Sequence, residues 1–260
     1  MSLFGFLKGK AANTAAAVMD RPVSTGYQQV EQGNVDEING ALRDSWKDAS
    51  LPEKQRAIVD PQLKAYREGG PVTVFDALAD IMVSGIGALA GLRVLEIGCS
   101  SGYYAEVFAT KRLGVSYEGC DYSAAFVEMA RRCYPDIRFE VQDAVALHYD
   151  DASFDVVVSG GCILHIPDYE RAIAEAVRVS RRWVIFHRTP IVHTHGPVTY
   201  TKKAYDVDTV EIHFNEQALV RLFSKYGLHV ADINRYSIEW DAAQSDSLAW
   251  KTYLCEKLTV

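Results

Sequence analysis

The sequence predicts an α/β fold in which a mostly parallel sheet is covered by helices. From Gly91 onward, short runs rich in β-branched and aromatic residues alternate with amphipathic runs of helical period, and this alternation is typical of strands joined by crossover helices. The first predicted strand runs directly into a glycine-rich turn, VLEIGCSSGYY. With 260 residues, 48% of them apolar, the chain is long enough for one large α/β domain with an appended piece.

Five runs are expected to form the parallel strands, because each is short, apolar and bounded by turn residues. They are residues 93–97, 115–120, 137–141, 154–159 and 183–187. Helices are expected between them. One carries Tyr104, Val107 and Phe108 on a single face, and two others begin after the N-cap residues Ser123 and Asp168.

The end of the chain departs from this alternation. Asn215 caps a predicted helix that ends at Gly227, and two β-like runs, residues 228–240 and 249–258, then follow with no long helix between them. Strands joined without a crossover helix pair antiparallel. We therefore expect a mostly parallel seven-stranded sheet whose last strand is antiparallel.

Residues 1–90 read as polar helical segments, 35–46, 52–67 and 72–86, separated by proline and glycine. We expect them to form an N-terminal helical cap on a main domain of residues 91–260. No internal repeat is visible.

Composition restricts the partners and the compartment. A formal net charge of −7 provides no basic footprint for nucleic acid. Five cysteines without a C-x-x-C pair indicate a reduced, cytoplasmic protein. The N-terminal segment MSLFGFLKGK lacks the apolar core of a signal peptide, and no run of about 18 apolar residues predicts a membrane span. We expect no nucleic-acid partner and no stable membrane insertion.

The loops after the predicted strands carry the residues that point to a ligand, because ligands of open α/β sheets bind outside the carboxyl ends of the strands. These loops contain Glu96-x-Gly98-x-Ser100-x-Gly102, Asp121, Gln142-Asp143-Ala144 and Gly160-Gly161-Cys162. Asp121 lies 19 residues after Gly102, where a carboxylate can accept hydrogen bonds from both ribose hydroxyls. Asp143 could accept from an adenine amine. The loops therefore predict an adenosine site.

The glycine spacing favours a cofactor without phosphates. A dinucleotide site needs G-x-G-x-x-G, whereas Ser100 occupies the second glycine position here, and no Gly-Lys-Ser/Thr of a phosphate-binding loop is present.

These motifs, together with FDVVVSGGCILHIPD, resemble the successive motifs of the class I S-adenosylmethionine-dependent methyltransferases. The resemblance covers residues 91–190 by motif and extends to the end of the chain through the reversed last strand. It implies a Rossmann-like methyltransferase fold and S-adenosyl-L-methionine as the cofactor. It places Gly98 and Gly102 at the amino-acid end of the cofactor, Asp121 on the ribose, and Asp143 and Ala144 beside the adenine. The other expected cofactor-binding residues are Glu96, Cys99, Ser100, Tyr122, Gln142 and Gly160.

The acceptor site is less constrained by the sequence. Methyl transfer from a sulfonium needs an aligned nucleophile, and a hydroxyl acceptor is helped by a base. His165 and His187 follow predicted strands and are the candidate bases, although a structural role is open for each. Residues 190–213 are long for a connection and are expected to form an acceptor-site lid. Within them His193 and His195 could bind a metal from a strand, but no third ligand is apparent and no metal is expected.

We therefore expect a methyltransferase that acts on a small molecule or a sugar-containing precursor, with O-methylation ahead of N- or C-methylation. Two other classes stay open. One is a dinucleotide-dependent oxidoreductase of the NAD type, which the glycine spacing disfavours. The other is a non-catalytic adenosine-binding protein. The sequence does not specify the oligomeric state.

Overall fold

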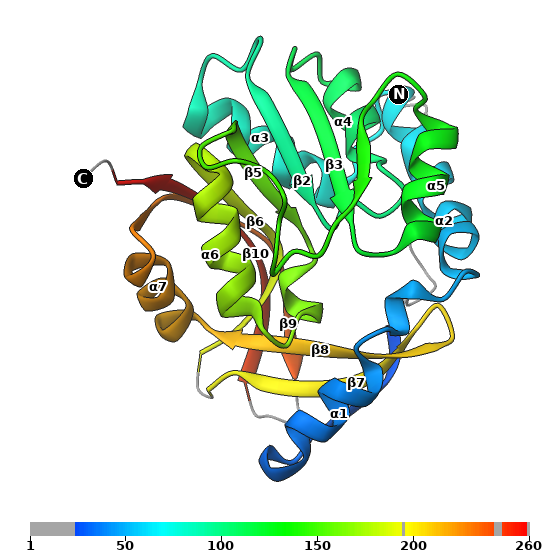
Figure 1. Ribbon diagram of the computed structural model, residues 1–260, viewed down its shortest axis with the longest axis vertical. Coiled ribbons are helices and arrows are strands. Elements are labelled where there is room, and N and C mark those ends of the chain that lie inside the picture. The colour runs from blue at the N-terminus through cyan, green and yellow to red at the C-terminus, as the bar shows by residue number, and fades with distance from the viewer. Residues whose placement is uncertain (1–23, 194–195, 242–245, 259–260) are drawn as a thin grey trace, which may run out of the picture.

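The computed structural model describes residues 24–193, 196–241 and 246–258. The N-terminal segment in which no signal peptide was expected, and His195, lie outside these ranges. Figure 1 shows a central twisted sheet with helices on both faces. Among the helices of the described ranges, none is both long and apolar enough to cross a membrane.

Seven strands form the core of the sheet, in the order β4-β3-β2-β5-β6-β10-β9. Their bounds are β2 (Arg93–Ile97), β3 (Ser116–Asp121), β4 (Phe139–Val141), β5 (Phe154–Gly160), β6 (Ser180–Val192), β9 (Leu228–Asp241) and β10 (Asp246–Lys257). The first five pair in parallel with their neighbours, whereas β10 is antiparallel to both β6 and β9. This arrangement confirms the Rossmann-like prediction, including the reversed last strand.

Two apolar layers hold helices against the sheet. On one face, α3 (Thr73–Ile86) and α4 (Tyr104–Thr110) pack through Leu78 and Val107 against Val156 and Leu254. On the other face, α6 (Tyr169–Val179) and α7 (Glu216–Lys225) pack through residues such as Ile173. The remaining helix of this domain, α5 (Ala124–Cys133), covers β3 and β4. Both faces of the parallel strands are therefore buried, as a parallel sheet requires.

The sheet has ten strands rather than seven. The extra strands are β1 (Ser24–Gln29), β7 (Val198–Ala204) and β8 (Val207–Asn215). β7 pairs antiparallel with both β1 and β8, and β8 joins the end of β6. Most of the segment expected as a lid is thus a hairpin. Its turn residues Tyr205 and Asp206 both have positive φ, as a tight hairpin turn demands.

Strand β6 changes partners at Arg188, a non-glycine residue with φ 55°. Before this point β6 pairs with β5, up to the pair of Gly160 with His187, and beyond it Ile191 and Val192 pair with β8. Between its pairs with Lys251 and Tyr253 of β10, β6 has one residue more than β10. This bulge lets β6 leave the core sheet and support the extra strands.

The N-terminal helices lie beside the carboxyl ends of the parallel strands. α1 (Val35–Leu42) contacts β8, and α2 (Leu51–Arg67) contacts α4 and α5. Lys54 Nζ of α2 donates to the Tyr205 carbonyl of the hairpin over 2.7 Å. These helices and the extra strands together enclose the space above the strand ends.

Candidate cofactor and acceptor site

A cavity of about 1320 Å³ opens at the carboxyl ends of the parallel strands. Its walls come from the loops after β2, β3, β4 and β5, from α1, and from the strands β1, β7 and β8. Of the residues predicted from the sequence, those in its lining are Gly98, Ser100, Asp121, Tyr122, Gln142, Asp143, Ala144, Gly160 and His165. Loops that are far apart in sequence therefore converge on one site.

The glycine turn after β2 is fixed to the end of β3 through Asp121. Gly98, Ser100 and Gly102 all have positive φ, so the backbone curls tightly. The two carboxylate oxygens of Asp121 accept from the backbone N–H groups of Ser100 and Ser123, each over 2.9 Å. Burial raises the pKa of Asp121 to about 6, while these hydrogen bonds act in the opposite direction. Asp121 thus carries a charge at neutral pH and braces the turn.

Helix α2 also holds this turn. The hydroxyl of Ser101 donates to Gln55 Oε1 over 2.6 Å, and both residues are buried. Gln55 lines the cavity, so the N-terminal helices contribute directly to the site. Tyr122 makes a second link, since its hydroxyl donates to the Arg43 carbonyl after α1 over 3.1 Å.

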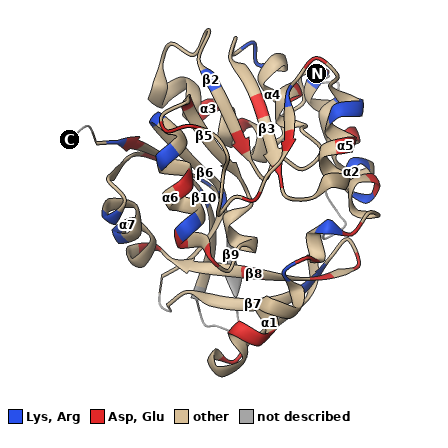
Figure 2. Cartoon of the chain, in the orientation of Figure 1, with Lys and Arg blue, Asp and Glu red and all other residues tan. Residues whose placement is uncertain are grey.

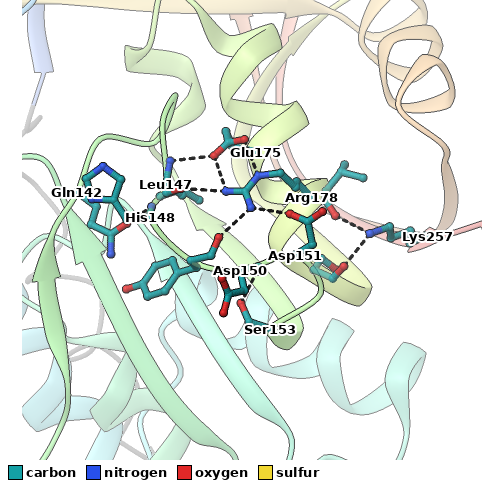
Figure 3. Close-up of polar contacts among 12 residues, drawn as sticks. Gln142, Leu147, His148, Asp150, Asp151, Ser153, Glu175, Arg178 and Lys257 are labelled. Atoms are coloured by element: carbon teal, nitrogen blue, oxygen red, sulfur yellow. Dashed lines mark hydrogen bonds and ion pairs between the residues drawn. The ribbon is translucent and has the colours of Figure 1, made fainter.

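The loop after β4 is held by α6, as Figure 3 shows. The guanidinium of Arg178 donates to the carbonyls of Leu147 and Tyr149 over 2.9 and 2.8 Å. Glu175 pairs with Arg178 and accepts from the Leu147 N–H over 2.8 Å. Gln142 Oε1 accepts from the N–H of His148 within the loop, also over 2.8 Å. The conformation of the loop that carries Gln142, Asp143 and Ala144 therefore depends on Arg178.

Replacing Arg178 with Met should weaken binding of S-adenosylhomocysteine by about 5- to 10-fold, since the loop loses hydrogen bonds worth roughly 1 kcal/mol net. Calorimetric titration measures the change. Arg181→Met is the matched control, because Arg181 pairs with Asp155 outside the cavity. Equal affinities for the two variants would show that the loop does not depend on Arg178.

Four of the predicted site residues support the cavity without lining it. Gly102 packs against Phe139 so closely that an added Cβ would lie 2.6 Å from the ring, which leaves no room for a side chain. Cys99 is fully buried and packs with Val127, Ala130 and Phe139. The carboxyl of Glu96 lies beneath Gly160, where it would meet any added Cβ, and accepts from the Tyr117 hydroxyl. The fourth residue is His187.

Burial raises the pKa of Glu96 to about 8, with the nearby Asp121 charge acting in the same direction. The folded protein therefore keeps a proton that the unfolded chain releases above about pH 4.5. The stability linked to this proton is present at low pH and is lost as pH rises towards 8.

The Glu96→Gln variant removes this titration. At each pH, the unfolding free energy of the variant is compared with that of the unmodified protein. This difference should shift in favour of the variant by on the order of 3 kcal/mol from pH 5 to pH 8. Urea unfolding at both pH values measures this, with the exposed Glu53→Gln as control. A constant difference between Glu96→Gln and the unmodified protein would contradict a protonated Glu96.

His187 is fully buried, and the structure does not bring it to the cavity. Its Nδ1 and Nε2 lie 2.7 and 2.8 Å from the hydroxyls of Thr252 and Tyr104. Burial, followed by the charge of Arg188, lowers its pKa well below the usual value. Both nitrogens of His187 are engaged by core hydroxyls, which favours the structural role over that of a base.

His165 does reach the cavity. Its Nδ1 lies 2.7 Å from the Val210 carbonyl, so Nδ1 carries the proton and Nε2 is the acceptor. Trp46 packs on the ring at 4.6 Å between centroids, with Tyr205 next to Trp46. Burial and the charge of Lys202 lower the pKa of His165 to about 3. His165 is thus a neutral hydrogen-bond acceptor in an aromatic wall.

A buried polar cluster on the extra strands is a part of the site that the sequence reasoning missed. Glu211 is completely buried and pairs with Lys202. It also accepts from His213 Nε2 over 2.9 Å and from the Tyr27 hydroxyl over 3.3 Å. All four residues line the cavity. The sequence did contain one signal for this cluster. Glu211 and His213 are two residues apart, and alternate residues of a strand lie on the same face.

Charged side chains of both signs line the cavity. Asp121, Asp143 and Arg43 lie where the parallel strands end and beside α1, whereas Arg188, Lys202 and Glu211 come from β6, β7 and β8. Figure 2 shows the charged residues along these elements. We call the first part, lined by residues 98–144, the cofactor half. The second, lined by Trp46, His165, Arg188, Lys202 and Tyr205, is the acceptor half.

Comparison with known proteins agrees with this geometry. Residues 95–186 match a family model described as a methyltransferase domain. Demethylmenaquinone methyltransferase of Renibacterium salmoninarum is 32% identical over 101 residues, or 39% of this chain and 42% of that protein. A probable S-adenosylmethionine-dependent methyltransferase of Mycolicibacterium smegmatis is 32% identical over 146 residues, or 55% and 54% of the two chains. The chain thus spans about half the length of these relatives.

A solved structure shares the fold over a greater length. It is 1,6-didemethyltoxoflavin-N1-methyltransferase of Burkholderia thailandensis with 1,6-didemethyltoxoflavin and S-adenosylhomocysteine bound. The alignment covers 80% of this chain and 91% of that one, at 18% identity and a TM-score of 0.51. Strand order, the motif-bearing loops and the family match together identify residues 95–186 as a methyltransferase domain of the class I S-adenosylmethionine-dependent type.

Proposed function

We propose that this chain transfers a methyl group from S-adenosylmethionine to an oxygen of a small molecule or sugar-containing precursor. The observation that carries the proposal is that one cavity is lined both by the predicted adenosine loops and by the aromatic residues Trp46 and Tyr205. A cavity of this extent can hold a cofactor and an acceptor side by side, which is the arrangement that a direct transfer needs.

The cofactor half supplies binding and orientation. In this proposal Asp121 accepts from the ribose hydroxyls, and the loop of Gln142, Asp143 and Ala144 binds the adenine. The curled backbone around Gly98 and Ser100 leaves room for the methionine part. The sulfonium of the bound cofactor supplies an activated methyl group, so the protein has to align the acceptor and exclude water.

The acceptor half supplies positioning. The rings of Trp46, Tyr205 and His165 provide flat surfaces for a planar acceptor. Nε2 of His165 can accept a hydrogen bond from an acceptor hydroxyl. A histidine with a pKa of about 3 is a weak base, so its contribution is mainly alignment. An acceptor hydroxyl that ionises readily suits such a site.

The relatives favour a second candidate, in which the methylated atom is a nitrogen or a carbon of a planar ring. One solved neighbour is named 1,6-didemethyltoxoflavin-N1-methyltransferase, and one relative is named demethylmenaquinone methyltransferase. The aromatic wall of the acceptor half fits planar rings of either kind.

The test is an assay for conversion of S-adenosylmethionine to S-adenosylhomocysteine with a panel of phenols, hydroxyquinones, N-heterocycles and glycosides. We expect turnover that depends on the acceptor and is lost in Asp121→Ala. Identification of the methylated product by mass spectrometry separates O- from N- and C-methylation. Binding of S-adenosylhomocysteine without turnover of any acceptor would favour a non-catalytic adenosine-binding protein.

His165→Ala should lower turnover with the best acceptor of that panel about 10- to 100-fold and leave cofactor affinity unchanged, because the acceptor loses its alignment. His165→Gln, which keeps an acceptor atom, should recover part of the rate. In the unmodified protein the rate should show no titration near pH 6.5, since the pKa of His165 is about 3. Unchanged turnover in His165→Ala would return this residue to a structural role.

A further inference from the structure

Arg188 lies at the bulge where β6 leaves the core sheet, and it lines the cavity. Its positive φ directs the side chain out of the regular alternation of the strand. The stem lies against the turn after β5, where a Cβ added at Gly161 would be 3.3 Å from both Cβ and Cδ of Arg188. Gly161 itself has φ 94°. Bulge and glycine together admit a long cationic side chain into the cavity.

No carboxylate within the described ranges pairs with this guanidinium. The groups that interact electrostatically with Arg188 are tyrosines: Tyr103, Tyr104, Tyr205 and Tyr236. By contrast, Arg178, Arg181 and Arg182 each form an ion pair, with Glu175, Asp155 and Glu256 respectively. Arg188 thus brings a positive charge into an enclosed site without a countercharge from the described residues.

Three acids of the cavity are engaged elsewhere. Asp121 accepts from two backbone N–H groups, Glu211 is held by Lys202 and His213, and Asp143 lies 3.7 Å from Arg43. The Arg188 side chain is exposed within the cavity, where a ligand can reach it. A ligand oxyanion would supply the opposite charge that the described residues do not.

The charge of Arg188 acts on the acceptor half. Burial is the main cause of the lowered pKa of His165 and of Lys202, and Arg188 adds to both effects. In the cofactor half, Arg188 acts on Tyr103 of the glycine turn, whose pKa burial raises and the guanidinium lowers. The guanidinium therefore acts on both halves of the cavity.

We propose that Arg188 binds a carboxylate of the acceptor, so that the preferred acceptors are organic acids. This proposal rests on the proposed methyltransferase function and specifies its substrate class. Arginine suits the role because its planar fork can donate two parallel hydrogen bonds to a carboxylate.

The transfer step balances with water as the proton acceptor, as the weak basicity of His165 requires. The electron pair of the acceptor hydroxyl forms the new bond to the methyl carbon, and the C–S bond breaks with its electron pair on sulfur. The hydroxyl proton passes to water, which gives a methyl ether and a thioether.

The test uses the full chain saturated with S-adenosylhomocysteine and a panel of matched pairs, in which each acid has its neutral amide as partner: hydroxybenzoates with hydroxybenzamides, and glucuronate with glucuronamide. We expect the acids to bind at least 10-fold more tightly than their amides, as a charge-assisted hydrogen bond implies. Arg188→Met should abolish this preference, and Arg188→Lys should keep part of it.

Arg182→Met is the matched control, because Arg182 lies on the same strand and pairs with Glu256 at the surface. It should behave like the unmodified protein. Arg188→Gly is a second variant that also removes the guanidinium, and glycine tolerates the positive φ at this position. If Arg188→Met does not fold, Arg188→Gly still tests the proposal. Circular dichroism checks the fold of each variant.

Two results would overturn the proposal. One is that the unmodified protein binds the acids no more tightly than their amides. The same conclusion holds if it binds none of the acids. The other concerns the cofactor: Arg188→Met lowers the affinity for S-adenosylhomocysteine 10-fold or more but does not change the affinity for methylthioadenosine. Because methylthioadenosine lacks the carboxylate, Arg188 would then bind the carboxylate of the cofactor. Failure of the unmodified protein to bind S-adenosylhomocysteine at all would instead contradict the proposed function itself.

Discussion

Asp121→Ala should weaken binding of S-adenosylhomocysteine about 30-fold or more. Two hydrogen bonds from ribose hydroxyls to a charged acceptor are worth roughly 2–4 kcal/mol together. The variant also removes the acceptor that holds the N–H groups of Ser100 and Ser123, so the glycine turn loses its brace. Calorimetric titration at pH 7.5 measures the effect, and Asp121→Asn, which keeps one acceptor oxygen, should show a smaller loss.

The pH dependence provides a second readout of the same residue. Since the pKa of Asp121 is about 6, the carboxylate that accepts ribose hydrogen bonds is lost as pH falls through 6. The dissociation constant of the unmodified protein should therefore rise below pH 6, whereas that of Asp121→Asn should not change in this range. An affinity of Asp121→Ala equal to that of the unmodified protein would remove Asp121 from the cofactor site.

Glu211→Met should destabilise the protein by about 3–5 kcal/mol, because it leaves the buried ammonium of Lys202 without its carboxylate. Urea unfolding measures the loss. Lys202→Met alone should also destabilise, and the double variant should recover much of the stability, since it removes both charges together. Strictly additive effects of the two substitutions would show that the pair is not coupled.

The same cluster has a defined pH dependence. Hydrogen bonding from His213 and the charge of Lys202 overcome the opposing effect of burial and lower the pKa of Glu211. A depressed carboxylate pKa contributes stability that is present above its unfolded value and is lost as pH falls. The difference in stability between the unmodified protein and Glu211→Met should therefore shrink below about pH 4.5.

The sequence predicted the core sheet well because each of its strands carries a strong local signal. Residues 93–97 and 154–159 are apolar runs that end at turn residues, and they match β2 and β5 within one residue. The reversed final strand followed from the lack of a helix between two β-like runs. The loops that line the cofactor half were predictable for a related reason: strand order places the carboxyl ends of parallel strands at one edge.

The acceptor half was harder to predict because its signals are not local. β1 and β7 pair although more than 170 residues of chain separate the paired positions Gln28 and Thr201. The β7–β8 turn is Tyr205-Asp206, which lacks the glycine that usually marks a tight hairpin. Nothing in the sequence around Arg188 indicates a bulge. Its placement in the cavity depends on the register of β6 against β10, which tertiary contacts decide.

His187 shows the limit of reasoning from strand ends alone. Its position at the end of the core part of β6 suggested a place in the site. The structure places His187 in the core against Tyr104 and Thr252, whereas the bulge and the positive φ of the next residue, Arg188, bring its side chain to the cavity. One step along the strand separates a core residue from a site residue.

The most direct test of the central claim is calorimetric titration of the unmodified protein with S-adenosylhomocysteine and, separately, with NADH. The geometry of the glycine turn and of Asp121 predicts micromolar binding of S-adenosylhomocysteine and no measurable binding of NADH. Binding of NADH alone would mean that the turn holds a pyrophosphate, and would contradict both the cofactor and the proposed methyl transfer.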